Sequence, residues 1–202
     1  MFILILLCIC YLCYWMKRIF AAIKVTPSEA FLSRYYSLKK SLEGEKIKWV
    51  EPENIHITMK FFGETPEHHI PAIHAALEKA AALSDPFDFN IMNTGIFGSS
   101  YKPRVIWFGI EPVDGIVRLA ESIFDQLQEI GVERDRQNFV PHLTVARIKF
   151  LDNRKHFQEV IIHYREGHIQ KEEVNKFHLF ESHLSPQGPK YGILSSYSLK
   201  NE

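Results

Sequence analysis

A four-residue pattern that occurs twice constrains this chain more than any other feature. It reads HITM from His56 and HLTV from His142, and the two copies begin 86 residues apart in a chain of 202. In a β-strand, residues i and i+2 share a face. Each copy therefore places its histidine and threonine on one side and apolar residues on the other. Two such copies predict a site held on two rigid strands.

The residue types of this repeat suit cleavage of a phosphodiester without a metal. One group must take a proton from the attacking oxygen, and another must protonate the leaving oxygen. Imidazole titrates near neutral pH, so His56 and His142 can supply one base and one acid. The hydroxyls of Thr58 and Thr144 can donate hydrogen bonds to non-bridging phosphate oxygens. A lone His-x-Thr is more often structural, and it is the duplication that favours a catalytic interpretation.

The charge and cysteine content restrict the other functions open to the chain. Lysine plus arginine equal aspartate plus glutamate at 24 each. A protein that coats long nucleic acid needs a broad basic surface, which this balance disfavours. The three cysteines, Cys8, Cys10 and Cys13, all precede residue 16. The rest of the chain can therefore form no disulfide, and we expect a cytoplasmic enzyme.

The first fifteen residues differ from the rest, because residues 2–16 carry no charge. As a helix the first sixteen residues would span roughly 24 Å, short of a bilayer core of roughly 30 Å. A signal peptide fits poorly, since no basic residue precedes the run and no small-x-small site follows it. The alternatives are a start of translation at Met16 or a short anchor with Lys17 and Arg18 on the cytoplasmic side. We expect residues 16–202 to form a single two-lobed domain.

Hydrophobic periodicity predicts strands that alternate with helices and then strands that return. The helix over residues 26–42 should begin with a capping box, Thr26 to Glu29, with Pro27 at its first position. This order is typical of an α+β fold with split βαβ units. The expected strands are 18–24, 46–50, 54–62, 87–91, 104–110, 142–150, 176–184 and 191–199. The other expected helices begin at residue 65 and cover 116–130 and 152–162.

Several segments resemble those of a known family. They read RIFAAI from Arg18, NIHITMKFFG from Asn54, PRVIW from Pro103, PHLTVAR from Pro141 and ESHLSPQGPKY from Glu181. The chain resembles the 2H phosphoesterases over residues 17–199. Within them it is most similar to the RNA 2′,3′-cyclic phosphodiesterases, also called 2′-5′ RNA ligases or LigT-like proteins.

The resemblance implies two pseudo-symmetric βαβ-type lobes whose antiparallel sheets face a central cleft. It makes His56 the proton donor and His142 the proton acceptor, with Thr58 and Thr144 on the phosphate. The implied reaction is hydrolysis of an RNA 2′,3′-cyclic phosphate to a 2′-phosphate, with 2′-5′ ligation as its reverse. It implies no cofactor, no metal and no obligate protein partner. We expect a monomer, with tRNA fragments among the candidate substrates.

Two cations near the motifs each allow two interpretations. Arg147 matches the arginine that commonly ends the second motif of the family, but its parity is opposite to that of His142. Either the strand bends and Arg147 meets phosphate, which the resemblance favours, or Arg147 serves the fold. Lys60 shares the parity of His56 and is expected either to flank the substrate or to be a solvated lysine.

Further candidates lie outside the repeat. Arg104 is expected to meet phosphate at the cleft rim or to cap a strand end. Tyr191 follows a turn at residues 185–189 and is expected to stack on a base or to pack against other side chains. His68, His69 and His74 lack the spacing of a helical metal pair, so we interpret them as surface residues.

Two alternatives remain open at this stage. The same site could act on a small cyclic nucleotide or on an ADP-ribose cyclic phosphate, or the chain could be a non-catalytic module that binds RNA ends. Rates on a cyclic-phosphate oligonucleotide and on a mononucleotide distinguish the substrates. Tight binding without turnover would indicate the binding module.

Overall fold

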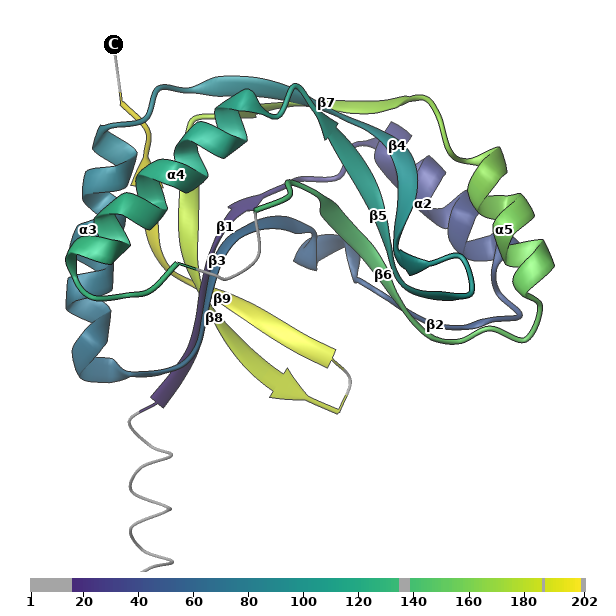
Figure 1. Ribbon diagram of the computed structural model, residues 1–202, viewed down its shortest axis with the longest axis horizontal. Coiled ribbons are helices and arrows are strands. Elements are labelled where there is room, and N and C mark those ends of the chain that lie inside the picture. Colours follow the sequence, from purple (N-terminus) through teal and green to yellow (C-terminus); the bar gives the residue numbers. More distant parts are fainter. Residues whose placement is uncertain (1–15, 135–138, 187, 201–202) are drawn as a thin grey trace, which may run out of the picture.

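Two antiparallel sheets with helices on their outer sides make up the described part of the protein (Figure 1). The computed structural model describes residues 16–134, 139–186 and 188–200. The first sheet has the order β3-β1-β8-β9 and the second the order β2-β6-β5-β4-β7. The strands are β1 (Met16–Lys24), β2 (Lys46–Trp49), β3 (His56–Pro66), β4 (Phe87–Ser99), β5 (Lys102–Glu111), β6 (Leu143–Phe150), β7 (His168–Val174), β8 (Lys176–Ser185) and β9 (Gly188–Ser198).

The helices divide between the two sheets. They are α2 (Glu29–Ser41), α3 (Ile70–Ala82), α4 (Asp114–Glu129) and α5 (Arg154–His163), with short 3₁₀ turns η1 (Pro52–Asn54) and η2 (Glu67–His69). In Figure 1, α3 and α4 lie side by side on the first sheet, and α2 and α5 lie beyond the second. The α+β fold with two lobes is therefore confirmed.

The two sheets are pseudo-symmetric, because β3-β1-β8-β9 corresponds to β6-β5-β4-β7. The two motif strands, β3 and β6, occupy equivalent places, and β1 and β5 are their respective neighbours. In the second sheet, β2 adds an edge strand beside β6. The two lobes thus have the same strand arrangement, except that β2 adds a row of side chains beside β6.

Several local predictions hold, and the start of α2 differs from expectation. Its N-cap is Ser28, whose Oγ accepts a hydrogen bond from Phe31 N at 3.2 Å, so the predicted capping box at Thr26 is wrong. The reason is tertiary. Gln170 on β7 accepts from Ser28 N at 2.7 Å and donates to Thr26 O at 2.9 Å, which fixes the approach to the helix. Residue 65, the other predicted helix start, lies within β3.

β7 was not predicted from the sequence. It reads HIQKEEV and forms the exposed edge of the second sheet, where it pairs with β4. Ile169 and Val174 are its buried apolar residues. Because polar residues are tolerated on an edge strand, the strand lacks a regular hydrophobic alternation.

The apolar faces of both sheets and the inward faces of the helices form one continuous core. Among the described residues, no helix is long and apolar enough to cross a membrane. The expectations for residues 1–15 lie outside the described part of the chain. β1 begins at Met16, which agrees with the strand expected there.

Candidate active site

The two motif histidines are oriented in the same way. His56 is the first residue of β3, and its Nδ1 donates to the carbonyl oxygen of Asn54 at 2.6 Å. His142 immediately precedes β6, and its Nδ1 donates to the carbonyl oxygen of Val140 at 2.8 Å. A carbonyl oxygen can only accept, so Nδ1 carries the hydrogen and Nε2 is left to exchange a proton.

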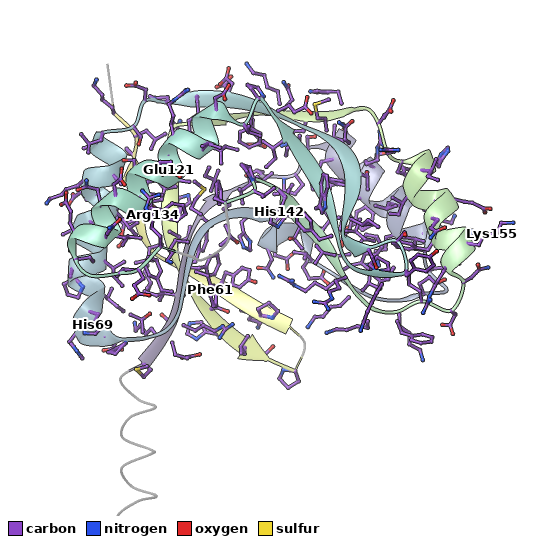
Figure 2. All side chains as sticks on the ribbon, in the orientation of Figure 1. Phe61, His69, Glu121, Arg134, His142 and Lys155 are labelled. Atoms are coloured by element: carbon purple, nitrogen blue, oxygen red, sulfur yellow. The ribbon has the colours of Figure 1, made fainter. Side chains whose placement is uncertain are left out.

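Both histidines line one cavity of about 710 Å³ between the sheets. Its walls come from the motif strands, from β2 with η1, and from the β8–β9 hairpin. In Figure 2 the labelled His142 and Phe61 lie on the inner side of the molecule, whereas His69 and Lys155 lie at its outer flanks. The cavity also contains most of the other expected site residues, namely Thr58, Thr144, Arg147 and Tyr191.

A bulge in β6 turns Arg147 into this cavity. Thr144 and Ala146 pair with consecutive residues of β5, which leaves Val145 as an extra residue. An extra residue in one strand reverses the alternation of faces beyond it. Arg147 therefore joins Thr144 on the cleft side despite its odd spacing, and Ala146 is buried. Of the two interpretations of the position of Arg147, the structure shows the bend of the strand.

The same bulge occurs in β3 and corrects the expectation for Lys60. Thr58 and Lys60 pair with consecutive residues of β1, which leaves Met59 extra. Lys60 is consequently buried, with 5% of its surface exposed, and its Nζ donates to Glu133 O at 3.1 Å. Phe61, which strict alternation from His56 would place on the core side, is 46% exposed and lines the cavity in place of Lys60.

Arg104 and Tyr191 have different surroundings. Arg104 is exposed near the start of β5 and does not line the cavity. Tyr191 lines the cavity, and its ring centroid lies 5.3 Å from that of His56 at an interplanar angle of 90°. It also meets Phe20 edge-on at 4.9 Å. Packing of Tyr191 is thus observed, and its exposed portion still borders the cavity.

The surroundings of His56 lower its pKa below the usual value. Burial is the main cause, since Phe20 and Tyr191 lie against the imidazole. The Arg147 guanidinium and His142 lower the pKa further, and the hydrogen bond to Asn54 opposes them. The free protein therefore favours neutral His56. A phosphate anion beside the ring would favour the protonated form.

Some cavity residues escaped the sequence interpretation. Asn54 supports His56 through its carbonyl, and its Nδ2 donates to Pro189 O at 3.0 Å, which ties the first motif to the β8–β9 hairpin. Its place two residues before the histidine was a usable signal. The other cavity residues missed include Arg18, Lys48, Phe61, Lys149 and Lys190, whose positions on the cavity wall depend on strand pairing.

Within the described part of the chain, no group of three or more histidine, cysteine, aspartate or glutamate side chains is arranged to hold a metal ion. His68 and His69 lie together on η2, with ring centroids 4.3 Å apart. His74 Nδ1 lies 2.9 Å from the Tyr197 hydroxyl oxygen. These three histidines lie outside the cavity.

Comparison with known proteins agrees with this geometry. The model of the LigT-like phosphoesterase family matches residues 25–107 and 110–191. An RNA 2′,3′-cyclic phosphodiesterase of Archaeoglobus fulgidus is 33% identical over 175 residues, which cover 86% of this chain and 96% of the relative. One from Methanocaldococcus jannaschii is 31% identical over 180 residues, covering 89% and 99%.

Solved structures show the same architecture. The Thermus thermophilus protein TT0787 superposes with a TM-score of 0.76 at 29% identity, covering 92% of this chain and 99% of that one. Escherichia coli LigT complexed with 3′-AMP gives a TM-score of 0.72 with the same coverage, and at 22% identity it shows the fold alone. The chain belongs to the LigT-like phosphoesterase family.

Proposed function

We propose that this protein hydrolyses the 2′,3′-cyclic phosphate at the end of an RNA to a 2′-phosphate by two-histidine acid–base catalysis. The main support is that His56 and His142, oriented by equivalent hydrogen bonds, line the same cavity. Relatives named RNA 2′,3′-cyclic phosphodiesterase, 30–34% identical over at least three quarters of this chain, support the substrate class.

In the proposed reaction His142 Nε2 takes a proton from water as the water oxygen bonds to phosphorus. The bond between phosphorus and O3′ breaks, and His56 Nε2 gives its proton to O3′. The product carries a 2′-phosphate and a 3′-hydroxyl. Thr58, Thr144 and Arg147 would donate hydrogen bonds to the non-bridging oxygens, where charge accumulates in the transition state.

The donor role of His56 requires the substrate to assist. Burial and Arg147 favour the neutral imidazole in the free protein. The cyclic phosphate carries a negative charge, and its arrival beside the ring raises the pKa of His56. Substrate binding would therefore favour the protonated form of His56, which is the form that acts as the acid. The same ring opening with a 5′-hydroxyl in place of water forms a 2′-5′ bond, but the large excess of water favours hydrolysis.

We further propose that residues 16–202 act as one two-lobed domain, as a monomer in the cytoplasm, without metal or an obligate protein partner. tRNA fragments that end in a cyclic phosphate belong to the proposed substrate class. The nucleotide named in the E. coli LigT complex, 3′-AMP, supports a ribonucleotide ligand for the same fold.

The direct test is incubation of the full chain with an RNA that ends in a 2′,3′-cyclic phosphate, with and without EDTA. We expect a 2′-phosphate product in both cases, and an ADP-ribose cyclic phosphate and a cyclic mononucleotide should react more slowly. Tight binding without turnover would indicate the binding module instead. Loss of activity in EDTA that zinc restores would contradict the metal-free mechanism.

A further inference from the structure

The cavity is far more basic than the protein as a whole. Two carboxylates, those of Glu51 and Glu53, line it, whereas the complete chain has equal numbers of both charges. Both carboxylates belong to the η1 region at one end of the wall. The cationic lining residues number five, and they are Arg18, Lys48, Arg147, Lys149 and Lys190. The lining of the cavity therefore has three more cations than carboxylates (5 − 2), in a chain whose formal net charge is zero.

Three of these cations form a row on one face of the second sheet. Arg147 on β6 pairs directly with Lys48 on the edge strand β2. Directly opposed residues place their Cβ atoms roughly 5 Å apart. Lys149 lies two residues beyond Arg147 on β6, where Ile148 and Phe150 pair with consecutive residues of β2 and leave Lys149 as an extra residue, and it lines the same cavity. The row therefore begins at the active-site arginine and leads away from the catalytic histidines.

The charges of this row are not neutralised within the protein. Across residues 16–134, 139–186 and 188–200, no ion pair or side-chain hydrogen bond involves Lys48, Arg147 or Lys149, and all three are exposed. Arg18, on the opposite wall, differs. Its guanidinium pairs with Glu64 at 3.6 Å and lies 4.7 Å above the ring of Phe61.

Lysines on an edge strand also have a purely structural explanation, since they discourage pairing with another chain. Lys46 on β2 fits that explanation. It is exposed, lies outside the cavity and has its ammonium 5.6 Å from the ring centroid of Phe150. Lys48 and Lys149 instead line the cavity that holds the catalytic pair. Edge protection does not account for that placement.

We propose that Lys48 and Lys149, continuing from Arg147, bind backbone phosphates of the RNA nucleotides that precede the cyclic end. The inference rests on the proposed function and deepens it. A cyclic mononucleotide brings one phosphate, which the histidines, threonines and Arg147 engage. An oligonucleotide brings one more phosphate per added nucleotide, and these can reach the two lysines. The row would thus select polynucleotide ends over small cyclic phosphates.

The first test measures kcat/KM on a cyclic mononucleotide and on cyclic-phosphate oligonucleotides of two to six nucleotides. We expect kcat/KM of the wild type to rise with length over the first added nucleotides. The double variant Lys48→Gln/Lys149→Gln should lose roughly 10- to 30-fold on the longer RNA at 0.1 M salt, and several-fold less on the mononucleotide. Lys46→Gln, the matched control on the same strand, should behave like wild type on every substrate.

The second test measures binding of an oligonucleotide that ends in a 2′-phosphate, by fluorescence anisotropy between 0.05 and 0.5 M salt. The slope of log K against log salt is negative, and each lost phosphate contact to a single strand reduces its magnitude by about 0.7. The double variant should therefore reduce this magnitude by about 1.4, and Lys46→Gln should leave it unchanged. An unchanged slope in the double variant would overturn the proposal.

The outcomes separate this inference from the proposed function. If wild type cleaves RNA ends but shows no length dependence, or if the double variant loses equally on all substrates, the phosphate row is wrong and the enzyme assignment stands. If the double variant loses as much kcat/KM on ADP-ribose cyclic phosphate as on the longer RNA, but not on the mononucleotide, the two lysines bind a pyrophosphate. That result would also contradict RNA as the substrate class. If no cyclic phosphate is cleaved, the proposed function fails, and the salt slope still tests the row.

Discussion

The two motif strands share one backbone design but carry different side chains beyond the threonine. Each has a histidine fixed by a carbonyl two residues earlier, a threonine on the cleft face and a bulge directly after it. Five residues after the histidine, β3 presents Phe61 and β6 presents Arg147. The residue before that is the buried Lys60 in one strand and the buried Ala146 in the other.

This difference divides the cleft into an aromatic wall on the first sheet, which also carries Arg18 and Lys190, and a cationic wall on the second sheet. On the first sheet, Phe20 and Phe180 form a small cluster with Tyr191, and Phe61 lies beside them. On the second sheet, the cations follow β6 and β2. The common strand arrangement places the two histidines symmetrically. Phe61 and Arg147, five residues after their histidines, differ in character and make the two sides of the site unequal. We interpret the cationic wall as the phosphate side and the aromatic wall as the side for ribose and base.

Removal of either histidine should have the largest effect on activity. Loss of one general acid or base costs about 10²- to 10⁴-fold in rate, or roughly 3 to 5 kcal/mol of barrier. We expect His56→Ala and His142→Ala each to lower kcat by that factor, and circular dichroism should show both variants folded. The double variant should lose far less than the product, because both groups act in one step. Near-normal turnover of either single variant would refute the paired mechanism.

The different contributions of Phe61 and Arg147, five residues after their histidines, can be tested directly. Loss of a hydrogen bond to a charged group costs about 1.5–3 kcal/mol, so Arg147→Gln should lower kcat/KM roughly 10- to 100-fold. Phe61→Leu should lower it only a few-fold and mainly through KM, because Phe61 provides contact area. The exchange variant Phe61→Arg/Arg147→Phe should stay as impaired as Arg147→Gln. If it regains wild-type activity, the two walls are interchangeable and our interpretation is wrong.

The threonines should matter less than Arg147, and about equally. Thr58→Val and Thr144→Val keep the side-chain shape and remove the hydroxyl donor. We expect each to lower kcat/KM about 10-fold, since a neutral donor to a charged oxygen is lost. Thr65→Val, a buried threonine of β3 whose Oγ1 donates to Gly63 O, is the control and should retain activity. A much larger loss at one motif than at the other would show that phosphate is held asymmetrically.

The smallest expected effect is on the titration of His56. Its pKa lies below the usual value of about 6.5, so on acidification this imidazole should protonate later than an exposed one. Arg147→Gln removes a cation that lowers the pKa, so the pKa should rise towards the usual value. Inorganic phosphate should raise it in the wild type. An NMR titration of the imidazole carbons measures both shifts, and an unchanged pKa on adding phosphate would place the anion elsewhere.

The sequence by itself predicted the two histidines and two threonines that line the cavity, and much of the framework. The duplicated His-x-Thr motif carried that prediction, because a strand gives residues i and i+2 a common face without help from other elements. The apolar spacing of α4 fixed its buried side, where Ile116, Leu119 and Ile123 enter the core. Both predictions rest on local periodicity.

Only the tertiary structure decided which side chains share the cleft with the histidines. A bulge arises from pairing with a strand distant in sequence, so residues 56–61 and 142–147 alone do not predict it. It buries Lys60, exposes Phe61 and turns Arg147 into the cavity. β7 and the Ser28 cap depend likewise on contacts between distant segments. Alternation is a local rule, and it fails where a neighbouring strand changes the register.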